Sequence, residues 1–191
     1  MSEPDAPNDG GNDAGLIETR IDGESVFDGK LLHVRRDRVR LPDGHDAMRE
    51  YIVHPGAVMM LARQDDGRYV MVRQFRYPLA RVFVEFPAGK IDAGEAPLAT
   101  ARRELVEEVG YTATHWRRVG VIHPVISYST EAIEIWHADG LQHVGRRLDE
   151  GEFLQPISRS VDELLAAFDR GEITDAKTVT GMFMLDRQRR R

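Results

Sequence analysis

One stretch of the chain, GKIDAGEAPLATARRELVEEVGY at residues 89–111, combines an amphipathic pattern with a high density of acidic side chains. Three of its apolar residues fall within about 40° of one another at about 100° per residue: Leu98, Leu105 and Val109. This spacing predicts a helix over 98–109 with one face in a core. Pro97 suits the first turn of that helix, and Gly110 suits the position just after its end.

Three carboxylates of this helix, Glu104, Glu107 and Glu108, share an arc of about 100° beside the apolar stripe. Because the chain has no cysteine, such a cluster of hard oxygen donors suits Mg²⁺ or Mn²⁺, ions that also take phosphate oxygens. A charged, solvated face is the other interpretation, since like charges at i,i+4 cost only about 0.2–0.5 kcal/mol per pair and Arg103 offsets one of them. Helix geometry alone leaves both interpretations open.

The spacing of the whole stretch decides between the two interpretations. Eight positions match the pattern G-x5-E-x7-R-E-U-x-E-E-x-G-U, where U is a bulky apolar residue: Gly89, Glu95, Arg103, Glu104, Leu105, Glu107, Glu108 and Gly110. The final U is Tyr111, which is aromatic. At about 6–7% usage of each residue type, chance would give this match about once in 10⁹ starting positions. The pattern is the Nudix box, so the chain resembles the Nudix hydrolases.

This resemblance implies an α+β fold, an α/β/α sandwich with a mixed sheet. It also implies a Mg²⁺-dependent pyrophosphatase, with Mn²⁺ as a second option, that hydrolyses a nucleoside diphosphate linked to another group. In similar proteins the metal is held by residues that match Glu104, Glu108, often Glu107, and the backbone carbonyl of Ala88. The residue that matches Arg103 orients these carboxylates.

A narrower resemblance comes from RQFRYP at 73–78 followed by VEFPAG at 84–89. These segments resemble the ADP-ribose pyrophosphatase and nucleoside diphosphate sugar hydrolase branch, in which positions that match Arg76 and Glu85 contact substrate. Glu131 resembles the glutamate of a Ser-x-Glu segment in that branch. An arginine on a diphosphate and a carboxylate on a ribose hydroxyl are chemically sound partners. A surface arginine and an edge-strand glutamate are the other interpretation.

The general base is expected outside the box, because metal occupies the box glutamates. The acidic loop at 147–153 offers Glu152 as first candidate and Glu150 as second, and Gly151 permits the loop to move. In related pyrophosphatases a glutamate on the corresponding loop is thought to activate water. A solvated acidic loop is the other interpretation, in which case Glu107 is the next candidate.

The rest of the chain divides into three expected parts. Residues 1–17 are acidic and rich in glycine and proline, which predicts a disordered tail, and their lack of an apolar segment argues against a signal peptide and for the cytoplasm. Residues 18–50 predict a small antiparallel β meander that is too small to stand alone and mediates a homodimer. Residues 51–191 are expected to form the hydrolase domain. The strands and later helices are expected at 25–27, 31–34, 38–41, 51–53, 56–61, 69–75, 82–86, 119–122, 132–136, 161–168 and 175–185.

Composition excludes several classes of function. The 191 residues carry a net charge of −6, with 32 acidic and 26 basic side chains, which argues against nucleic-acid binding. No apolar run approaches the ~20 residues of a membrane span. The absence of cysteine excludes thiolate metal sites and cysteine nucleophiles. The segment GEITDAKT at 171–178 is one residue from a P-loop, but Ala176 replaces the second glycine and a helix precedes it.

The sequence therefore predicts an enzyme that hydrolyses the diphosphate of ADP-ribose or a related small-molecule nucleoside diphosphate sugar, giving a nucleoside monophosphate and a sugar phosphate. Two alternatives stay open: a non-catalytic Nudix module that senses such a nucleotide, and a pyrophosphatase that removes oxidised nucleoside triphosphates. A sensor is expected to lack some box glutamates and to carry a DNA-binding segment. The arginines at 73 and 76 argue against the triphosphate alternative.

Overall fold

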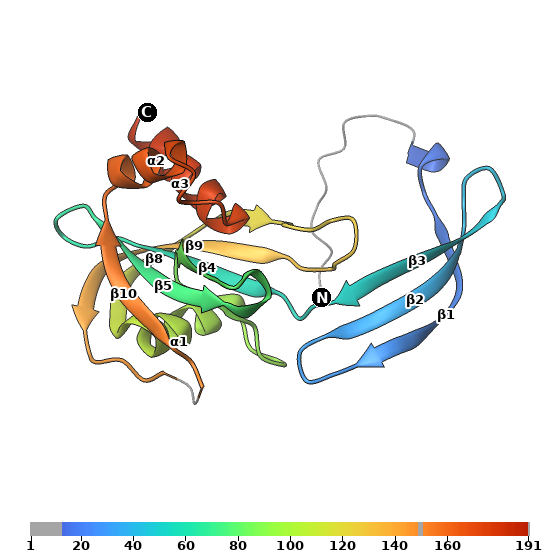
Figure 1. Ribbon diagram of the computed structural model, residues 1–191, viewed down its shortest axis with the longest axis horizontal. Coiled ribbons are helices and arrows are strands. Elements are labelled where there is room, and N and C mark those ends of the chain that lie inside the picture. Colours follow the sequence, from blue (N-terminus) through green and yellow to red (C-terminus); the bar gives the residue numbers. More distant parts are fainter. Residues whose placement is uncertain (1–12, 149–150, 191) are drawn as a thin grey trace. The chain divides into compact units, whose positions relative to one another are not determined.

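The computed structural model describes residues 13–148 and 151–190, which form two compact units. The first unit runs to His54 and includes 127–129, and the second contains 55–126 and the chain from Thr130 onward. Figure 1 traces both units in sequence colours. Most of the expected tail, residues 1–12, lies outside the described residues, and Asp13–Gly15 form a short 3-10 turn.

The first unit is an antiparallel sheet in the order β1-β2-β3, which confirms the expected meander. Its strands are longer than predicted: β1 Thr19–Asp28, β2 His33–Arg40 and β3 Asp46–Val53. Strand β2 reads HVRRDRVR, and ion pairs across the sheet stabilise it, such as Arg36 with Glu50 at 2.8 Å. Charged strands of this kind lack the apolar alternation that marks a strand in sequence, so only fragments of them were predicted.

The expected boundary between residues 50 and 51 falls inside β3. The strand continues to Val53, and the register pairs Val53 with His33 of β2. The predicted strand at 51–53 therefore exists, but it completes the first sheet and does not begin the second unit. The chain enters the second unit after His54.

The second unit contains two sheets between helices, which confirms the sandwich. One sheet has the order β7-β4-β9-β8 with β4 and β9 parallel, and the other is the antiparallel β10-β5-β6. Figure 1 shows α1 on one side of the sheets and α2 and α3 on the other. The strands are β4 Ala57–Ala62, β5 Tyr69–Arg76, β6 Arg81–Glu85, β7 Ala88–Lys90, β8 Tyr111–Ile122, β9 Ile133–His143 and β10 Leu154–Arg159. The helices are α1 Pro97–Val109, α2 Val161–Asp169 and α3 Ala176–Arg189, with a 3-10 turn, η2, at Tyr77–Leu79.

Strand β4 is buried along its whole length because helices cover both of its faces. Met59 and Leu61 belong to a core that includes α2 and α3, and Val58 and Met60 belong to a second core that includes α1. This two-sided burial explains the continuous apolar sequence of β4. None of the helices in the described part of the chain is both long enough and apolar enough to cross a membrane.

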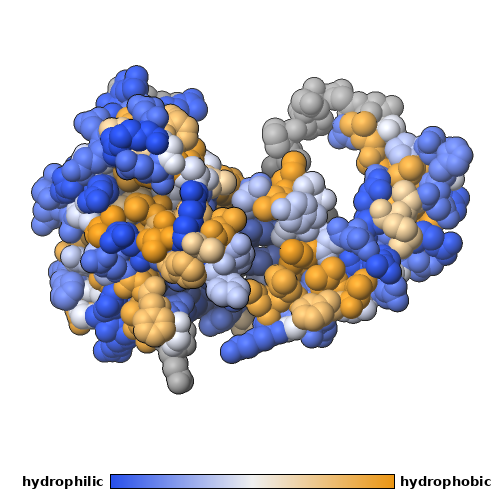
Figure 2. All heavy atoms as spheres, viewed as in Figure 1, coloured by the Kyte–Doolittle hydropathy of each residue, from blue (hydrophilic) through white to orange (hydrophobic). Residues whose placement is uncertain are grey.

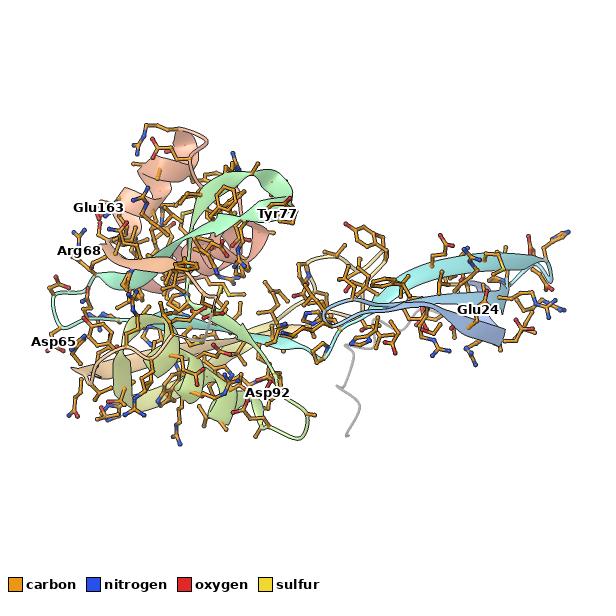
Figure 3. The ribbon with its side chains drawn as sticks, turned by 60° about the horizontal axis from the view of Figure 1, so that its bottom comes forward. Glu24, Asp65, Arg68, Tyr77, Asp92 and Glu163 are labelled. Atoms are coloured by element: carbon orange, nitrogen blue, oxygen red, sulfur yellow. The ribbon has the colours of Figure 1, made fainter. Side chains whose placement is uncertain are left out.

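The hairpin between β4 and β5 is tied to the start of α2. Arg68, directly after the turn at 65–67, donates to Glu163 at 2.6 Å and to the carbonyl of Ser158 at 3.0 Å. Figure 3 labels Arg68 and Glu163 near one another. Glu163 also completes a capping box with Ser160, so one carboxylate starts the helix and holds the hairpin.

Candidate active site

Helix α1 and strand β7 bring the two ends of the box together. The helix begins at Pro97 and ends against Gly110, whose φ of 77° provides the left-handed cap that the sequence predicted. Gly89 on β7 lies against the carboxylate of Glu104, and a Cβ at Gly89 would stand 1.9 Å from that side chain. The first position of the box is therefore a glycine because Glu104 occupies the space of any larger residue.

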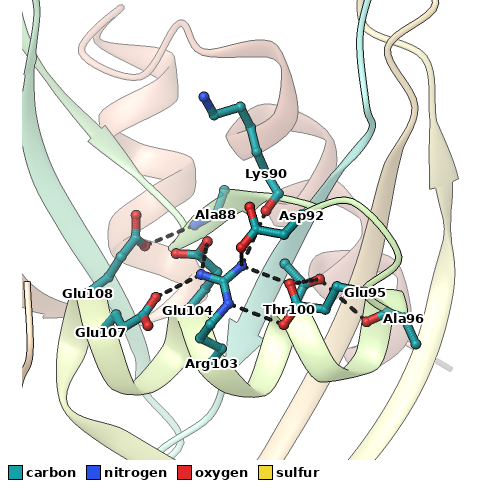
Figure 4. A network of polar contacts seen from close by, with 10 residues as sticks. All are labelled: Ala88, Lys90, Asp92, Glu95, Ala96, Thr100, Arg103, Glu104, Glu107 and Glu108. Carbon is teal, nitrogen blue, oxygen red and sulfur yellow. Dashed lines mark hydrogen bonds and ion pairs between the residues drawn. The ribbon is translucent and has the colours of Figure 1, made fainter. Parts of the chain in front are cut away.

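Arg103 holds the acidic side chains of the box in place, as Figure 4 shows. Its Nη1 donates to Glu104 and to Glu107, both at 2.8 Å. Its Nε and Nη2 donate to the two oxygens of Glu95 at 3.2 and 2.9 Å. Hydrogen bonds from Arg103 and Thr100 lower the pKa of Glu95 to about 2. Glu95 therefore holds the guanidinium of Arg103 through Nε and Nη2, and Nη1 of the same group orients Glu104 and Glu107.

Glu108 is the most deeply buried carboxylate of the cluster, since the residue is 5% exposed. The backbone N–H of Ala88 donates to its Oε2 at 3.0 Å. Burial, followed by repulsion from Glu104, raises the pKa of Glu108 to about 8. Burial also raises the pKa of Glu104 to about 6, against the opposing effect of Arg103. Both carboxylates therefore lie where their negative charge lacks full compensation.

This arrangement fits a divalent metal ion. Within 13–148 and 151–190, no three His, Asp or Glu side chains already form a closed metal cage. Mg²⁺ does not need one, because it binds through one or two carboxylates and completes its shell with waters and substrate phosphates. The raised pKa values of Glu104 and Glu108 show two carboxylates short of positive charge. Glu108 accepts from the backbone of Ala88, and Arg103 holds both Glu104 and Glu107.

The structure describes one of the two loop candidates for the general base, Glu152. Glu152 is exposed, and its negative charge raises the pKa of both Glu104 and Glu108, so it lies close to the cluster. It also lines a cavity of about 390 Å³ together with Arg73 and Arg146. Glu150 lies outside the described residues.

The substrate candidates Arg76 and Glu85 bind each other. Arg76 Nε and Nη2 donate to the two Glu85 oxygens at 2.8 and 2.7 Å. Lys177 of α3 also donates to Glu85, a contact that the sequence analysis did not find. The available signal was a lysine in the first turn of a predicted helix, which is an unfavourable place for a cation. Glu131, the third substrate candidate, is half-buried and lies two residues before β9.

Two known domain families match the sequence. The NUDIX domain matches residues 53–181, and the nucleoside diphosphate sugar hydrolase N-terminal domain matches residues 18–52. The two matches meet at the end of β3, close to where the structure divides the chain.

Similar proteins cover most of the chain. An ADP-ribose pyrophosphatase of Bacillus subtilis (strain 168) is 39% identical over 165 residues, which are 85% of this chain and 89% of the relative. A methanol dehydrogenase activator of Bacillus methanolicus is 37% identical over 173 residues, with coverage of 90% and 94%. A solved structure described as an ADP compounds hydrolase has a TM-score of 0.80 at 24% identity, over 90% of this chain and 93% of that one. This last likeness shows a shared fold.

Proposed function

The chain belongs to the Nudix family, and from this we propose that it hydrolyses the diphosphate linkage of ADP-ribose or a related nucleoside diphosphate sugar. The products are a nucleoside monophosphate and a sugar phosphate. The observation that carries the proposal is the complete box, with Arg103 on Glu104 and Glu107 and with Glu108 buried beside Ala88. The ADP-ribose pyrophosphatase among the similar proteins supports the choice of substrate class.

The residues of the site have separate parts in this reaction. Glu104 and Glu108, with the backbone carbonyl of Ala88, would hold Mg²⁺, with Mn²⁺ as a second option. When bound, the ion neutralises charge on the diphosphate and makes water a better nucleophile. Arg103 keeps the carboxylates oriented throughout, and Arg76 offers a guanidinium to the diphosphate.

Glu152 acts as the general base in this mechanism. It takes a proton from the water that attacks one phosphorus, and the bond from that phosphorus to the bridging oxygen breaks. The closeness of Glu152 to Glu104 and Glu108 supports this role. Glu131 is proposed as a further substrate contact, because it resembles the glutamate of the Ser-x-Glu segment.

We further propose that the first unit mediates a homodimer and that the protein acts in the cytoplasm. The first unit exposes a group of large apolar side chains on and beside β1 and β2: Val26, Phe27, Leu31 and Leu32. Figure 2 shows apolar surface over this part of the unit. Exposed apolar patches on a three-stranded sheet are typical of protein interfaces.

A screen of nucleoside diphosphate sugars with Mg²⁺ tests the function. Phosphate released after phosphatase treatment reports each hydrolysis, and ADP-ribose or a related compound is expected to give the highest rate. The Glu108→Gln variant is the control for contaminating activity. If the protein binds these compounds and hydrolyses none of them, it is the sensing module instead. The similarity to a protein described as an activator is the reason to test this alternative.

A further inference from the structure

The N-terminal turn of α3 reaches strand β6 through a lysine. Lys177 Nζ donates to Glu85, and it also donates to Asp175 at 2.9 Å. The lysine side chain is 12% exposed and the glutamate side chain 3%, so this contact is almost fully shielded from water. A buried carboxylate costs much free energy unless cations and hydrogen bonds compensate its charge.

Helix propensity does not explain a lysine at this position. Asp175 is the N-cap of α3, so Lys177 is the second helical residue, where the positive end of the helix dipole disfavours a cation. Asp175 itself accepts from the backbone N–H and the hydroxyl of Thr178 at 3.0 and 2.6 Å. The helix terminus thus partly neutralises Asp175, and part of the lysine charge is left for Glu85.

The lysine changes what Arg76 offers to a ligand. Arg76 uses the edge formed by Nε and Nη2 on Glu85, which leaves Nη1 on the other edge, and its side chain is 42% exposed. With Glu85 as its only partner, the arginine would form a neutral pair. Lys177 shares the negative charge of Glu85 with Arg76, so Glu85 neutralises the exposed guanidinium less completely than it would alone.

The same turn of α3 also fixes the backbone that leads to the box. The N–H of Phe86 donates to the hydroxyl of Thr178 at 3.3 Å, and Thr178 is fully buried. Two residues later, Ala88 donates to Glu108. One helix terminus therefore holds both the carboxylate behind Arg76 and the strand that runs to the metal-binding carboxylates.

We propose that Lys177 is a positioning residue: it clamps Glu85 so that Arg76 presents its outer guanidinium edge to the substrate diphosphate. This inference rests on the proposed function for the identity of the ligand. In this proposal Glu85 acts through Arg76, since both of its oxygens accept from Arg76 and one of them also accepts from Lys177. Lys177 belongs to the segment at 171–178 that differs from a P-loop at one residue. In this proposal it contributes to phosphate recognition through Glu85 and Arg76 and does not contact phosphate itself.

Kinetics of three variants test the positioning role: Lys177→Met, Lys177→Arg and Arg187→Met. Arg187 is an exposed cation on the same helix and serves as the matched control. For ADP-ribose with Mg²⁺, we expect Lys177→Met to raise KM about tenfold or more, as for loss of one charge-assisted contact, with kcat within about threefold. Lys177→Arg is expected to restore most of the affinity, and Arg187→Met is expected to match the wild type.

A second measurement needs no hydrolysis, so it separates this proposal from the proposed function. In protein with isotopically labelled arginine, the NMR signal of the Arg76 Nε–H, assigned with Arg76→Lys, reports its hydrogen bond to Glu85. We expect Lys177→Met to shift or broaden this signal, and Lys177→Arg to keep it. An unchanged signal in Lys177→Met, or an equal KM change in Arg187→Met, would overturn the proposal. If circular dichroism shows that Lys177→Met is unfolded, Lys177→Gln takes its place in both measurements.

Discussion

The carboxylate of Glu108 is buried and lies near two further acidic side chains, Glu104 and Glu152. The backbone N–H of Ala88 donates to this carboxylate, and the charge of Arg76 lowers its pKa without offsetting the effect of burial. A bound divalent ion would supply the missing positive charge. The carboxylate whose ionised form is most disfavoured in the metal-free chain is therefore the one best suited to bind metal.

Replacing Glu108 with glutamine keeps the shape of the side chain and removes its charge. We expect kcat to fall by about 10³-fold or more, equivalent to about 4 kcal/mol of barrier. The far-ultraviolet circular dichroism is expected to stay unchanged, because the amide still accepts from Ala88. Steady-state kinetics over a range of Mg²⁺ concentrations check this, and turnover near that of the wild type would remove Glu108 from the metal site.

The raised pKa of Glu108 also predicts a pH dependence of stability in the metal-free protein. The folded state holds this proton up to about pH 8, whereas the ordinary pKa of a glutamate carboxyl is 4.5. Between these values the folded state binds more protons than the unfolded chain, so its stability falls as pH rises. We expect Tm in EDTA to decrease across this range, and to decrease less in Glu108→Gln. Added Mg²⁺ is expected to restore Tm at the alkaline end, and a flat profile in the wild type would contradict the assignment.

Glu152 and Glu150 are two acidic residues of one loop, which makes each the control for the other. We expect Glu152→Gln to lower kcat by about 10²–10⁴-fold, the usual effect of losing a general base, and Glu150→Gln to have a smaller effect. Measuring kcat for both variants at saturating substrate decides between them. If both stay within about threefold of the wild type, the base lies elsewhere, and Glu107 is the next candidate.

At the scale of elements, the contact between β7 and α1 decides how closely the carboxylates approach the backbone. Gly89 leaves room for Glu104, and Arg103 ties the helix back to the loop before it through Glu95. The hydrogen bond from Ala88 of β7 to Glu108 of α1 joins the two elements directly. The position of the helix, and not only its sequence, sets the geometry of the site.

Gly89→Ala tests this contact because the new Cβ would stand 1.9 Å from Glu104. We expect the displaced carboxylate to lower kcat about 10²-fold, the effect of an error of about 1 Å in a catalytic site. Gly120→Ala is the matched control, since a Cβ there meets no atom within 4 Å and the backbone is not in the left-handed region. Equal activity in the two variants would show that Glu104 has room to move.

At the scale of the whole molecule, the two units differ in what they bury. The second unit has two apolar cores. In the first unit, strand β1 is exposed along its length, and Val39 of β2 is the only buried apolar residue among the described residues of that unit. A sheet with so small a core needs further apolar contacts to be stable. A second copy of the chain would provide them.

Charged substitutions on the first sheet test the homodimer. We expect Phe27→Glu combined with Leu31→Glu to shift the protein from dimer to monomer in analytical ultracentrifugation, because both side chains are exposed and apolar. Val144→Glu, at an exposed apolar residue of the second unit, is the control and is expected to stay dimeric. A monomeric wild type, or an unchanged dimer in the double variant, would refute the role of this surface.

The sequence alone determined the features that depend on neighbours three or four residues apart. Helix α1, its C-terminal cap and its acidic face follow from local periodicity, so the predicted helix ends at the observed residue and starts one residue after the observed start. Likewise, strands β4 and β5 and helix α2 were predicted to within one residue of their observed bounds, whereas α3 continues beyond its predicted end at 185 to Arg189.

Only the tertiary structure decided which side chains from distant segments meet. Lys177 and Glu85 are 92 positions apart, and the sequence marks the lysine as unusual in a first helical turn without indicating its partner. The charged strands β2 and β3 are likewise stabilised by partners across the sheet, such as Arg36 and Glu50. The burial of Glu108, which raises its pKa, depends on β7 packing over α1. Each of these properties depends on residues that are distant in the sequence and meet only in the folded protein. A helix, in contrast, is indicated by the local spacing of apolar residues along the chain.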